Sequence, residues 1–167
     1  MSFAREPASE PRAFDLVWRV CRFEELTVTE LQFIYMARQK VFAIEQQCAY
    51  LDADGHDEHA FHLAAWSTQQ REPLAYARLL DPGVKYAEAS IGRVITAAPA
   101  RGRGLGRELV ARALGHAQSV WPGGALRISA QTRLAAFYED FGFRAVGPPY
   151  LEDGIDHTEM FRASSAA

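Results

Sequence analysis

The amino-acid sequence predicts one domain of the α/β class (α+β mixed sheet), in which helices flank a central β-sheet. Strand-like segments follow one another in the first half of the chain and alternate with helix-like segments afterwards. That order is typical of a mixed sheet with helices on its faces. The chain has 167 residues, of which 49% are apolar and 23% charged, so it can bury a core without disulfides or metals. No repeat is visible, and no linker is long enough to divide two domains.

The first part of the chain is predicted to contain one helix and several strands. A helix is expected over 28–45, because Thr27 and Glu30 form a capping box and apolar residues then recur at helical spacing. A polar loop, 48–60, follows this helix, and the polar segment 67–73 is expected to be a turn. The strands expected here are 16–23, 60–66, 74–80 and 90–96.

The second part of the chain alternates between strands and helices. The strand over 90–96 contains Gly92, and a glycine inside a strand predicts a bulge or a close approach of another backbone. Pro99 ends that element, and an amphipathic helix is expected over 104–120, before Pro122. The remaining expected elements are a strand at 126–130, a helix at 133–141 capped by Gly142, and strands at 143–146 and 157–161.

The ends of the chain and its two cysteines bear on where the protein works. Residues 1–14 and 163–167 are expected to be flexible tails around a single domain over 15–162. The N-terminal segment lacks the apolar core of a signal peptide, and no run approaches the ~20 apolar residues of a membrane span. Cys21 and Cys48 have neither a disulfide framework nor metal-ligand spacing. We therefore expect a cytoplasmic protein that binds no metal and no membrane.

A glycine- and arginine-rich segment begins the helix predicted over 104–120. The formal net charge of −3 argues against a large face for nucleic acid, yet residues 101–107 contain three arginines and three glycines. The helix has no Ser, Thr, Asp or Asn to cap it. Unpaired N–H groups and the helix dipole bind anions, phosphates above all, and glycines let the backbone come close to a ligand. The segment predicts a pyrophosphate site, with a solvated surface turn as the alternative.

Two common phosphate-binding motifs do not fit this segment. A Walker loop ends in Gly-Lys-Ser/Thr, whereas the chain has Gly106-Arg107-Glu108. A dinucleotide fingerprint belongs near the first strand, and these glycines come late in the chain. The pattern R-x-x-G-x-G, at Arg101, Gly104 and Gly106, resembles the GNAT acyltransferase superfamily, in which the corresponding segment cradles the pyrophosphate of coenzyme A.

A second segment, 130–143, extends the resemblance. In GNAT enzymes a strand is followed by a short helix that carries a tyrosine, and Gly-Phe then opens the next strand, as Tyr138 and Gly142-Phe143 do here. The segments VFAIEQQCAYLDADGHD, YARLL, IGRVI and YLEDGIDHTEM are similar to the ElaA-type branch of the superfamily. The resemblance covers about residues 15–162.

The resemblance implies the GNAT acyl-CoA N-acyltransferase fold and a set of site residues. Backbone N–H groups of 102–107 would hold the pyrophosphate, and the edge of the strand at Val94 and Ile95 would pair with the pantetheine amides. An N–H of the bulged strand would stabilise the oxyanion of the thioester. Tyr138 would protonate or stabilise the leaving thiolate, unless its hydroxyl is satisfied by backbone in the core. The residues implied to bind acetyl-CoA are Val94, Ile95, Arg101, Gly102, Arg103, Gly104, Leu105, Gly106, Arg107, Gln131 and Phe137.

The general base is not given by the resemblance, because Ser90 stands where some GNAT families carry a glutamate. Glu45 and His157 lead the candidates, since the loop after 45 and the last strand are expected to border the acceptor side. The side chains that could take the proton are Glu45, Asp54, Asp57, His62, Glu88 and His157. Each has a structural alternative, such as capping a turn or filling a core position.

Two arginines, Arg78 and Arg93, lie within apolar strands and demand a partner if they are buried. The acidic loop over 52–58 can supply it, and we expect a structural salt bridge there. Cys48 has no basic neighbour to activate it, so direct transfer without an acyl-enzyme is expected.

The sequence therefore predicts an N-acetyltransferase that moves an acetyl group from acetyl-CoA to a primary amine of a small molecule or peptide. The alternatives are a non-catalytic acyl-CoA-binding module on the same fold and an acyltransferase for longer acyl chains. The acidic loop hints at a cationic acceptor such as a polyamine, a lysine or an aminoglycoside. The protein is expected to be a monomer or a homodimer.

Overall fold

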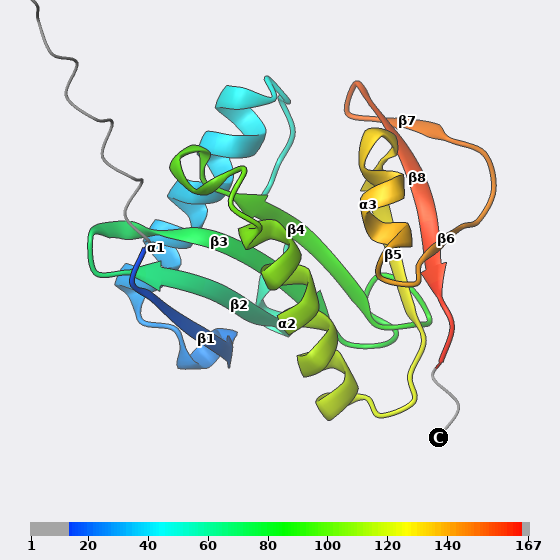
Figure 1. The fold of residues 1–167 in the computed structure, drawn as a ribbon, viewed down its shortest axis with the longest axis horizontal. Helices are drawn as coiled ribbons and strands as arrows, with labels where there is room; N and C mark the ends of the chain where they lie inside the picture. Colours follow the sequence, from blue (N-terminus) through cyan, green and yellow to red (C-terminus); the bar gives the residue numbers. More distant parts are fainter. Residues whose placement is uncertain (1–13, 165–167) are drawn as a thin grey trace, which may run out of the picture.

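The computed structural model describes residues 14–164 and has the mixed α/β architecture that the sequence predicts (Figure 1). Its strands form two four-stranded sheets that lie side by side, with helices packed against them. The expected tails, 1–14 and 163–167, fall almost wholly outside the described residues, so the domain limits stay a prediction.

The first sheet is antiparallel, in the order β1-β2-β3-β4. Its strands are β1 (Leu16–Arg22), β2 (Ala60–Ser67), β3 (Gln70–Leu80) and β4 (Ser90–Thr96). The turn expected over 67–73 is wrong, because Ser67 already pairs with Gln70 and β3 begins there. The ladder shifts register between Ala65 and Ser67, and this irregularity accommodates Pro73, which has no N–H to donate.

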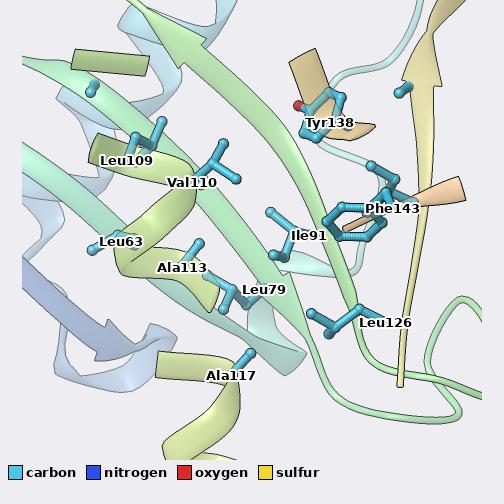
Figure 2. Close-up of a cluster of buried hydrophobic side chains, with 14 of the residues drawn as sticks. Leu63, Leu79, Ile91, Leu109, Val110, Ala113, Ala117, Leu126, Tyr138 and Phe143 are labelled. Atoms are coloured by element: carbon cyan, nitrogen blue, oxygen red, sulfur yellow. The ribbon is translucent and has the colours of Figure 1, made fainter. Parts of the chain in front are cut away.

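The two long helices cover opposite faces of this sheet. Helix α1 (Val28–Gln39) packs Ile34 and Ala37 onto the face that carries Ala64 and Tyr76. Helix α2 (Leu105–Val120) covers the other face. Figure 2 shows this larger core, which contains Leu63, Leu79, Ile91, Leu109, Val110, Ala113, Ala117, Leu126, Tyr138 and Phe143. Both faces of the sheet are therefore covered, which explains why β3 is buried from Pro73 to Leu80.

The helix predicted over 28–45 is present in two parts. It begins at the capping box of Thr27 and Glu30, as expected, but the α-helix ends at Gln39. Lys40–Glu45 continues it as a π-helix, η2. A wider turn changes the direction in which side chains leave the helix, so Glu45 and Gln46 reach the cleft described below. The short 3-10 helices are η1 (Phe23–Glu25), η3 (Asp57–His59), η4 (Ala98–Ala100) and η5 (Thr132–Leu134).

The second sheet gathers the C-terminal strands. Its central pair is β5 (Leu126–Gln131) and β8 (Ile155–Arg162), and the short strands β6 (Arg144–Ala145) and β7 (Tyr150–Glu152) also pair with β8. The sequence did not predict β7. It forms a hairpin with β8 through Asp153 and Gly154, both with positive φ, a conformation that Asp-Gly favours in two-residue turns.

The short helix between the two halves of the second sheet carries Tyr138. Helix α3 (Ala135–Glu139) is shorter than the predicted 133–141, because η5 precedes it as a 3-10 turn. Gly142 ends this region with φ +85°, and the N–H of Phe143 donates to the carbonyl of Tyr138 at 3.2 Å. The predicted glycine cap is confirmed.

The two sheets meet at one point and then separate. Ala89 and Leu126 form an isolated parallel bridge, and the N–H of Arg127 donates to the carbonyl of Ala89 at 3.0 Å. Beyond this bridge β4 pairs only with β3, and β5 only with β8. The mixed sheet is thus two antiparallel sheets that splay apart (Figure 1). A cleft lies between β4 and β5.

Candidate active site

The cleft between β4 and β5 has a volume of about 740 Å³. Its walls are the two splayed strands, the end of the π-helix, the loop after it and the β7–β8 hairpin. Of the predicted site residues, those that line it are Glu45, Val94, Ile95, Arg101, Gln131, Tyr138 and His157. The fold therefore brings together in one cavity side chains that are up to 112 positions apart in the chain, from Glu45 to His157.

The glycine turn, residues 101–107, lies at the start of α2 beside this cleft. Gly102 and Gly104 have φ of +74° and +79°, and the helix N-cap Gly104 provides no side-chain hydrogen bond. A Cβ atom on either glycine would meet nothing within 4 Å, and one on Gly106 would meet only Thr96 Oγ1 at 3.7 Å. The backbone amides at this helix end are therefore open to a ligand. Whether these residues bind coenzyme A stays a prediction.

The arginines of the glycine turn make contacts of their own. Arg101 donates from Nη2 to Glu45 Oε2 at 2.6 Å and from Nε to the carbonyl of Thr96 at 2.9 Å. Arg107 forms an exposed ion pair with Asp140 at 2.9 Å. The guanidinium of Arg103 lies 5.0 Å from the ring centre of Phe14. All three lie on the surface, where weak pairs can be exchanged for a phosphate.

Strand β4 is the edge of its sheet along the cleft, so its outer backbone groups at Val94 and Ile95 face the cavity. The register with β3 shifts between Tyr76 and Arg78, which confirms the bulge expected from Gly92. The positive φ belongs to the next residue, Arg93, at +53°. A bulge turns backbone N–H groups out of the ladder and makes them available as donors.

Tyr138 points from α3 into the cleft region, above Ile91 in Figure 2. The residue is 7% exposed, and burial raises the pKa of its phenol to about 12. No described residue forms a hydrogen bond with its hydroxyl, in contrast to the alternative that backbone satisfies it. Tyr138 therefore stays protonated at neutral pH and has a donor to offer.

The other predicted cofactor residues differ in their access to the cleft. Gln131, at the end of β5, donates from Nε2 to Gln46 Oε1 at 3.1 Å across the cleft. Leu105 is buried in the core, so only its backbone can meet a ligand. Phe137 does not line the cleft and instead makes an edge-to-face contact with Phe141, with ring centres 5.3 Å apart.

The two leading base candidates have different surroundings. The carboxylate of Glu45 is held in an ion pair with Arg101, 2.6 Å from Nη2, and would have to leave this pair to contact an amine in the cleft. His157 Nδ1 lies 2.9 Å from the carbonyl of Ile155, and a carbonyl can only accept, so Nδ1 carries the proton. Its Nε2 is then free of hydrogen in the neutral ring and lies 3.9 Å from Glu152 Oε2. His157 thus presents a lone pair in the cleft.

His62 and Glu88 have structural partners. His62 is buried, accepts from the Tyr76 hydroxyl at 2.8 Å through Nδ1 and donates to the carbonyl of Asp57 at 2.9 Å through Nε2. Glu88 does not line the cleft and pairs with Arg127 at 2.8 Å, whose hydrogen bonds lower the pKa of Glu88 to about 2. Neither is placed to take a proton from an acceptor in the cleft.

The aspartates of the acidic loop form an ion-pair network with three arginines. It consists of Arg38, Arg78 and Arg93 with Asp52, Asp54 and Asp57. Arg78 donates to both oxygens of Asp54 at 2.6 and 2.7 Å and to Asp57 at 3.0 Å. The structural salt bridge predicted for Arg78 and Arg93 is confirmed.

Arg38, at the centre of this network, was not predicted. It is fully buried, with 0% exposure, and lies 2.7 Å from Asp52 and 2.8 Å from Asp57. Burial alone would raise the pKa of Asp57, but hydrogen bonds from Arg38 and the charges of Arg38 and Arg78 lower it overall. An arginine on the buried face of α1 was the available signal, since a buried charge requires a partner.

The sequence also missed several polar residues at the far end of the cleft. Lys85 comes from the loop between β3 and β4, and Glu152 and Asp153 come from the β7–β8 hairpin. Cys48 lines the cleft too, and its Sγ lies 3.6 Å from the carbonyl of Gln46. No sequence pattern marked the first three, because their proximity depends on two loops that are far apart in the chain.

Within residues 14–164, no group of three His, Cys, Asp or Glu side chains is arranged to hold a metal ion. None of the helices described there is long and apolar enough to cross a membrane.

The chain is similar in sequence to known proteins over most of its length. A family model described as "Acetyltransferase (GNAT) domain" matches residues 31–163. A UPF0039 protein from Synechocystis sp. is 41% identical over 146 residues, which cover 87% of this chain and 94% of that protein. Protein ElaA from Escherichia coli is 36% identical over 147 residues, covering 87% and 95%.

Solved structures agree with the sequence matches. An acyl-CoA N-acyltransferase from Pseudomonas aeruginosa has a TM-score of 0.85 and 42% identity, and the match covers 89% of this chain and 100% of that one. Escherichia coli ElaA has a TM-score of 0.82 and 35% identity over 88% of this chain and 99% of that one. The residues matched by the family model, 31–163, include the glycine turn and the short helix α3.

Proposed function

The chain belongs to the GNAT acetyltransferase family, whose members use acyl-CoA, and from this premise we propose that it transfers an acetyl group from acetyl-CoA to a primary amine by direct attack on the thioester. The observation that carries the proposal is a protonated, otherwise unbonded Tyr138 hydroxyl in a cleft that adjoins open helix amides. The nature of the acyl group and of the acceptor is proposed here, whereas acyl-CoA-dependent acyl transfer follows from the family.

The glycine turn fits a coenzyme A pyrophosphate. Positive φ at Gly102 and Gly104 turns successive amides toward one side, and no atom fills the space where their side chains would stand. The start of α2 adds the partial positive charge of its dipole, and Arg101, Arg103 and Arg107 surround it. Bound acetyl-CoA would supply the activated thioester, and the remaining chemistry falls to residues of this chain.

Strand β4 would orient the cofactor and stabilise charge. The unpaired edge at Val94 and Ile95 offers backbone donors and acceptors to the amides of the pantetheine arm, as one strand does to another. The bulge around Gly92 and Arg93 directs an N–H toward the cleft. That N–H would stabilise the negative charge that develops on the carbonyl oxygen during attack.

Tyr138 would act on the leaving sulfur. The pKa of its phenol, about 12, lies above the ~8.5 of a thiol. Complete proton transfer to the thiolate is therefore unfavourable, and the role that fits is a hydrogen bond that stabilises the thiolate as the carbon–sulfur bond breaks. Its buried position strengthens that hydrogen bond, because few water molecules compete for it.

His157 would take the proton from the amine. Its Nε2 lone pair faces the cleft, while Glu45 is held in an ion pair with Arg101. As the amine nitrogen bonds to the carbonyl carbon, its proton would pass to Nε2, directly or through water. Ser90 has a hydroxyl that does not ionise near neutral pH, so it cannot replace the glutamate of other families.

The test measures release of coenzyme A from acetyl-CoA by the full chain with a panel of primary amines. Tyr138→Phe should lower kcat about 100-fold and leave the affinity for coenzyme A unchanged, because only the hydroxyl is lost. His157→Gln should lower kcat by a similar factor. Tyr150→Phe is the control, a tyrosine of the hairpin that does not line the cleft. Binding without turnover on any amine would contradict the proposal and favour a non-catalytic module.

A further inference from the structure

The charges along the cleft are mostly paired inside the protein. Asp54 is taken up by Arg78 and Arg93, and Glu45 is held by Arg101. Asp54 is the acidic residue of the loop that lines the cleft, and its carboxylate is therefore not free for an acceptor there, so the interpretation that the loop attracts a cationic amine loses its basis. The charged side chains that remain available to an acceptor lie at the end of the cleft near the β3–β4 loop and the β7–β8 hairpin.

Lys85, on the β3–β4 loop, is the positively charged side chain at this end of the cleft. Its Nζ lies 5.2 Å from the ring centre of Tyr86, and within residues 14–164 no carboxylate comes within the 4.0 Å of an ion pair. Lys85 is an exposed residue, yet neighbouring protein atoms remove part of the water around its ammonium, and this desolvation lowers the pKa of Lys85. An anion beside it would replace the lost hydration.

Glu152, on the β7–β8 hairpin, is the anion of the opposite wall. It accepts from Ser129 at 3.1 Å and lies 3.9 Å from His157 Nε2. Lys85 and Glu152 both line the cleft, and they form no ion pair with each other. Asp153 lines the cleft beside Glu152. The cavity thus has a positive wall and a negative wall.

We infer that the acceptor carries an anionic group, in the simplest case a carboxylate, that binds Lys85 while its amine lies between Glu152 and His157. This inference rests on the proposed transfer to an amine. Glu152 would attract the ammonium form, which must first lose one proton to solvent. The neutral amine then attacks the thioester carbon, and His157 Nε2, next to it, would receive the second proton as the thiolate leaves. An amino acid satisfies both walls at once, whereas a diamine would leave a second cation against Lys85.

The experiment compares acceptors that differ only in the carboxylate. The full chain is incubated with acetyl-CoA and with each member of three pairs: L-phenylalanine and 2-phenylethylamine, L-lysine and cadaverine, 4-aminobutanoate and propylamine. Release of coenzyme A gives kcat and KM for each. In at least one pair the carboxylated acceptor should have a kcat/KM at least about tenfold higher, the size expected for one charge-assisted hydrogen bond.

Variants of the two lysines of the chain assign that preference to one residue. Lys85→Gln should raise KM for the carboxylated member at least about tenfold, leave kcat within about twofold, and leave the bare amine unchanged. Lys85→Glu should invert the preference toward cadaverine over L-lysine. Lys40→Gln is the matched control, because Lys40 is 54% exposed, pairs with Glu72 and does not line the cleft.

Three results would overturn the inference. Equal or better use of the bare amine in every pair would show that no anion is recognised, while leaving acetyl transfer intact. A fall in kcat on both members of a pair in Lys85→Gln would place Lys85 in the chemistry instead. If coenzyme A raises the melting temperature of the protein but no acceptor in the panel leads to its release from acetyl-CoA, the proposed function fails. The inference then fails with it.

Discussion

The ion-pair network and the glycine turn both concentrate charge near the cleft, and they use it in opposite ways. In the network, three arginines and three aspartates satisfy one another, with Arg38 and Asp57 almost fully buried. In the glycine turn, the arginines remain at the surface and the helix amides have no side-chain cap. One region is closed on itself, and the other is open to a ligand.

The difference shows that a charged segment is recognised as a binding site by what it leaves unsatisfied. The acidic loop, 52–58, has the more conspicuous composition, yet its three aspartates fix the loop over β3 and β4 and are not available. The glycine turn leaves backbone donors without partners, and such donors demand one when they are covered. Stability should therefore depend on the network and binding on the turn.

The largest expected effect comes from opening the network. Asp57→Ala leaves the buried guanidinium groups of Arg38 and Arg78 short of a carboxylate, and we expect the free energy of unfolding to fall by about 3–5 kcal/mol. Urea unfolding measures this. Asp140→Ala is the control: it breaks the exposed pair with Arg107 and should cost less than about 1 kcal/mol. Equal losses in the free energy of unfolding of the two variants would show that the buried network stabilises the protein no more than an exposed ion pair does.

The second-largest expected effect is a pH dependence of unfolding stability that arises from His62, beside the ion-pair network. Burial lowers the pKa of His62, so below the ~6.5 of the unfolded state only the unfolded chain takes up this proton, and stability falls as the pH falls. The loss can reach at most about 2 kcal/mol at pH 5. His62→Gln should flatten unfolding stability between pH 7 and pH 5, whereas His59→Gln, at an exposed site, should not. An unchanged slope in His62→Gln would exclude this origin.

The glycine turn should respond in binding more than in stability. Gly104→Ala places a Cβ at a left-handed φ of +79°, which costs about 1–2 kcal/mol of stability, and fills space that we assign to the pyrophosphate. Affinity for coenzyme A should fall about tenfold by calorimetry. Gly115→Ala lies in open space within α2 and should stabilise by about 0.5–1 kcal/mol without changing affinity. Unaltered affinity in Gly104→Ala would leave the turn without its proposed ligand.

The smallest effect separates the two base candidates. Glu45→Gln releases Arg101, so coenzyme A should bind about two- to threefold more tightly, and stability should change by less than about 1 kcal/mol. With His157 as the base, kcat should stay within about twofold. A fall of about 100-fold would instead assign the base to Glu45. Glu72→Gln, which releases the exposed Lys40, controls for loss of a surface pair.

The sequence predicted the helices and strands better than the contacts between them. Local signals, such as the capping box at Thr27 and the cap at Gly142, gave the helix start and the last cap correctly. The turn over 67–73 was misplaced because polar residues on a strand end look like a loop, and pairing of Ser67 with Gln70 depends on the neighbouring strand. The π-helix after Gln39 also has no signal in helical spacing.

By itself, the sequence determined the fold class, the position of the glycine turn and the amphipathic helix behind it, because these follow from preferences that act over a few residues. The tertiary structure alone decided that Arg38 reaches the acidic loop, that Glu45 is paired with Arg101, and that Lys85 and Glu152 line the same cleft. These pairs join segments 14 to 67 residues apart, and only the splaying of β4 from β5 brings the last pair to one cavity. The physical reason is that a charged side chain pairs with whichever opposite charge lies near it in the folded protein, whatever their separation along the chain.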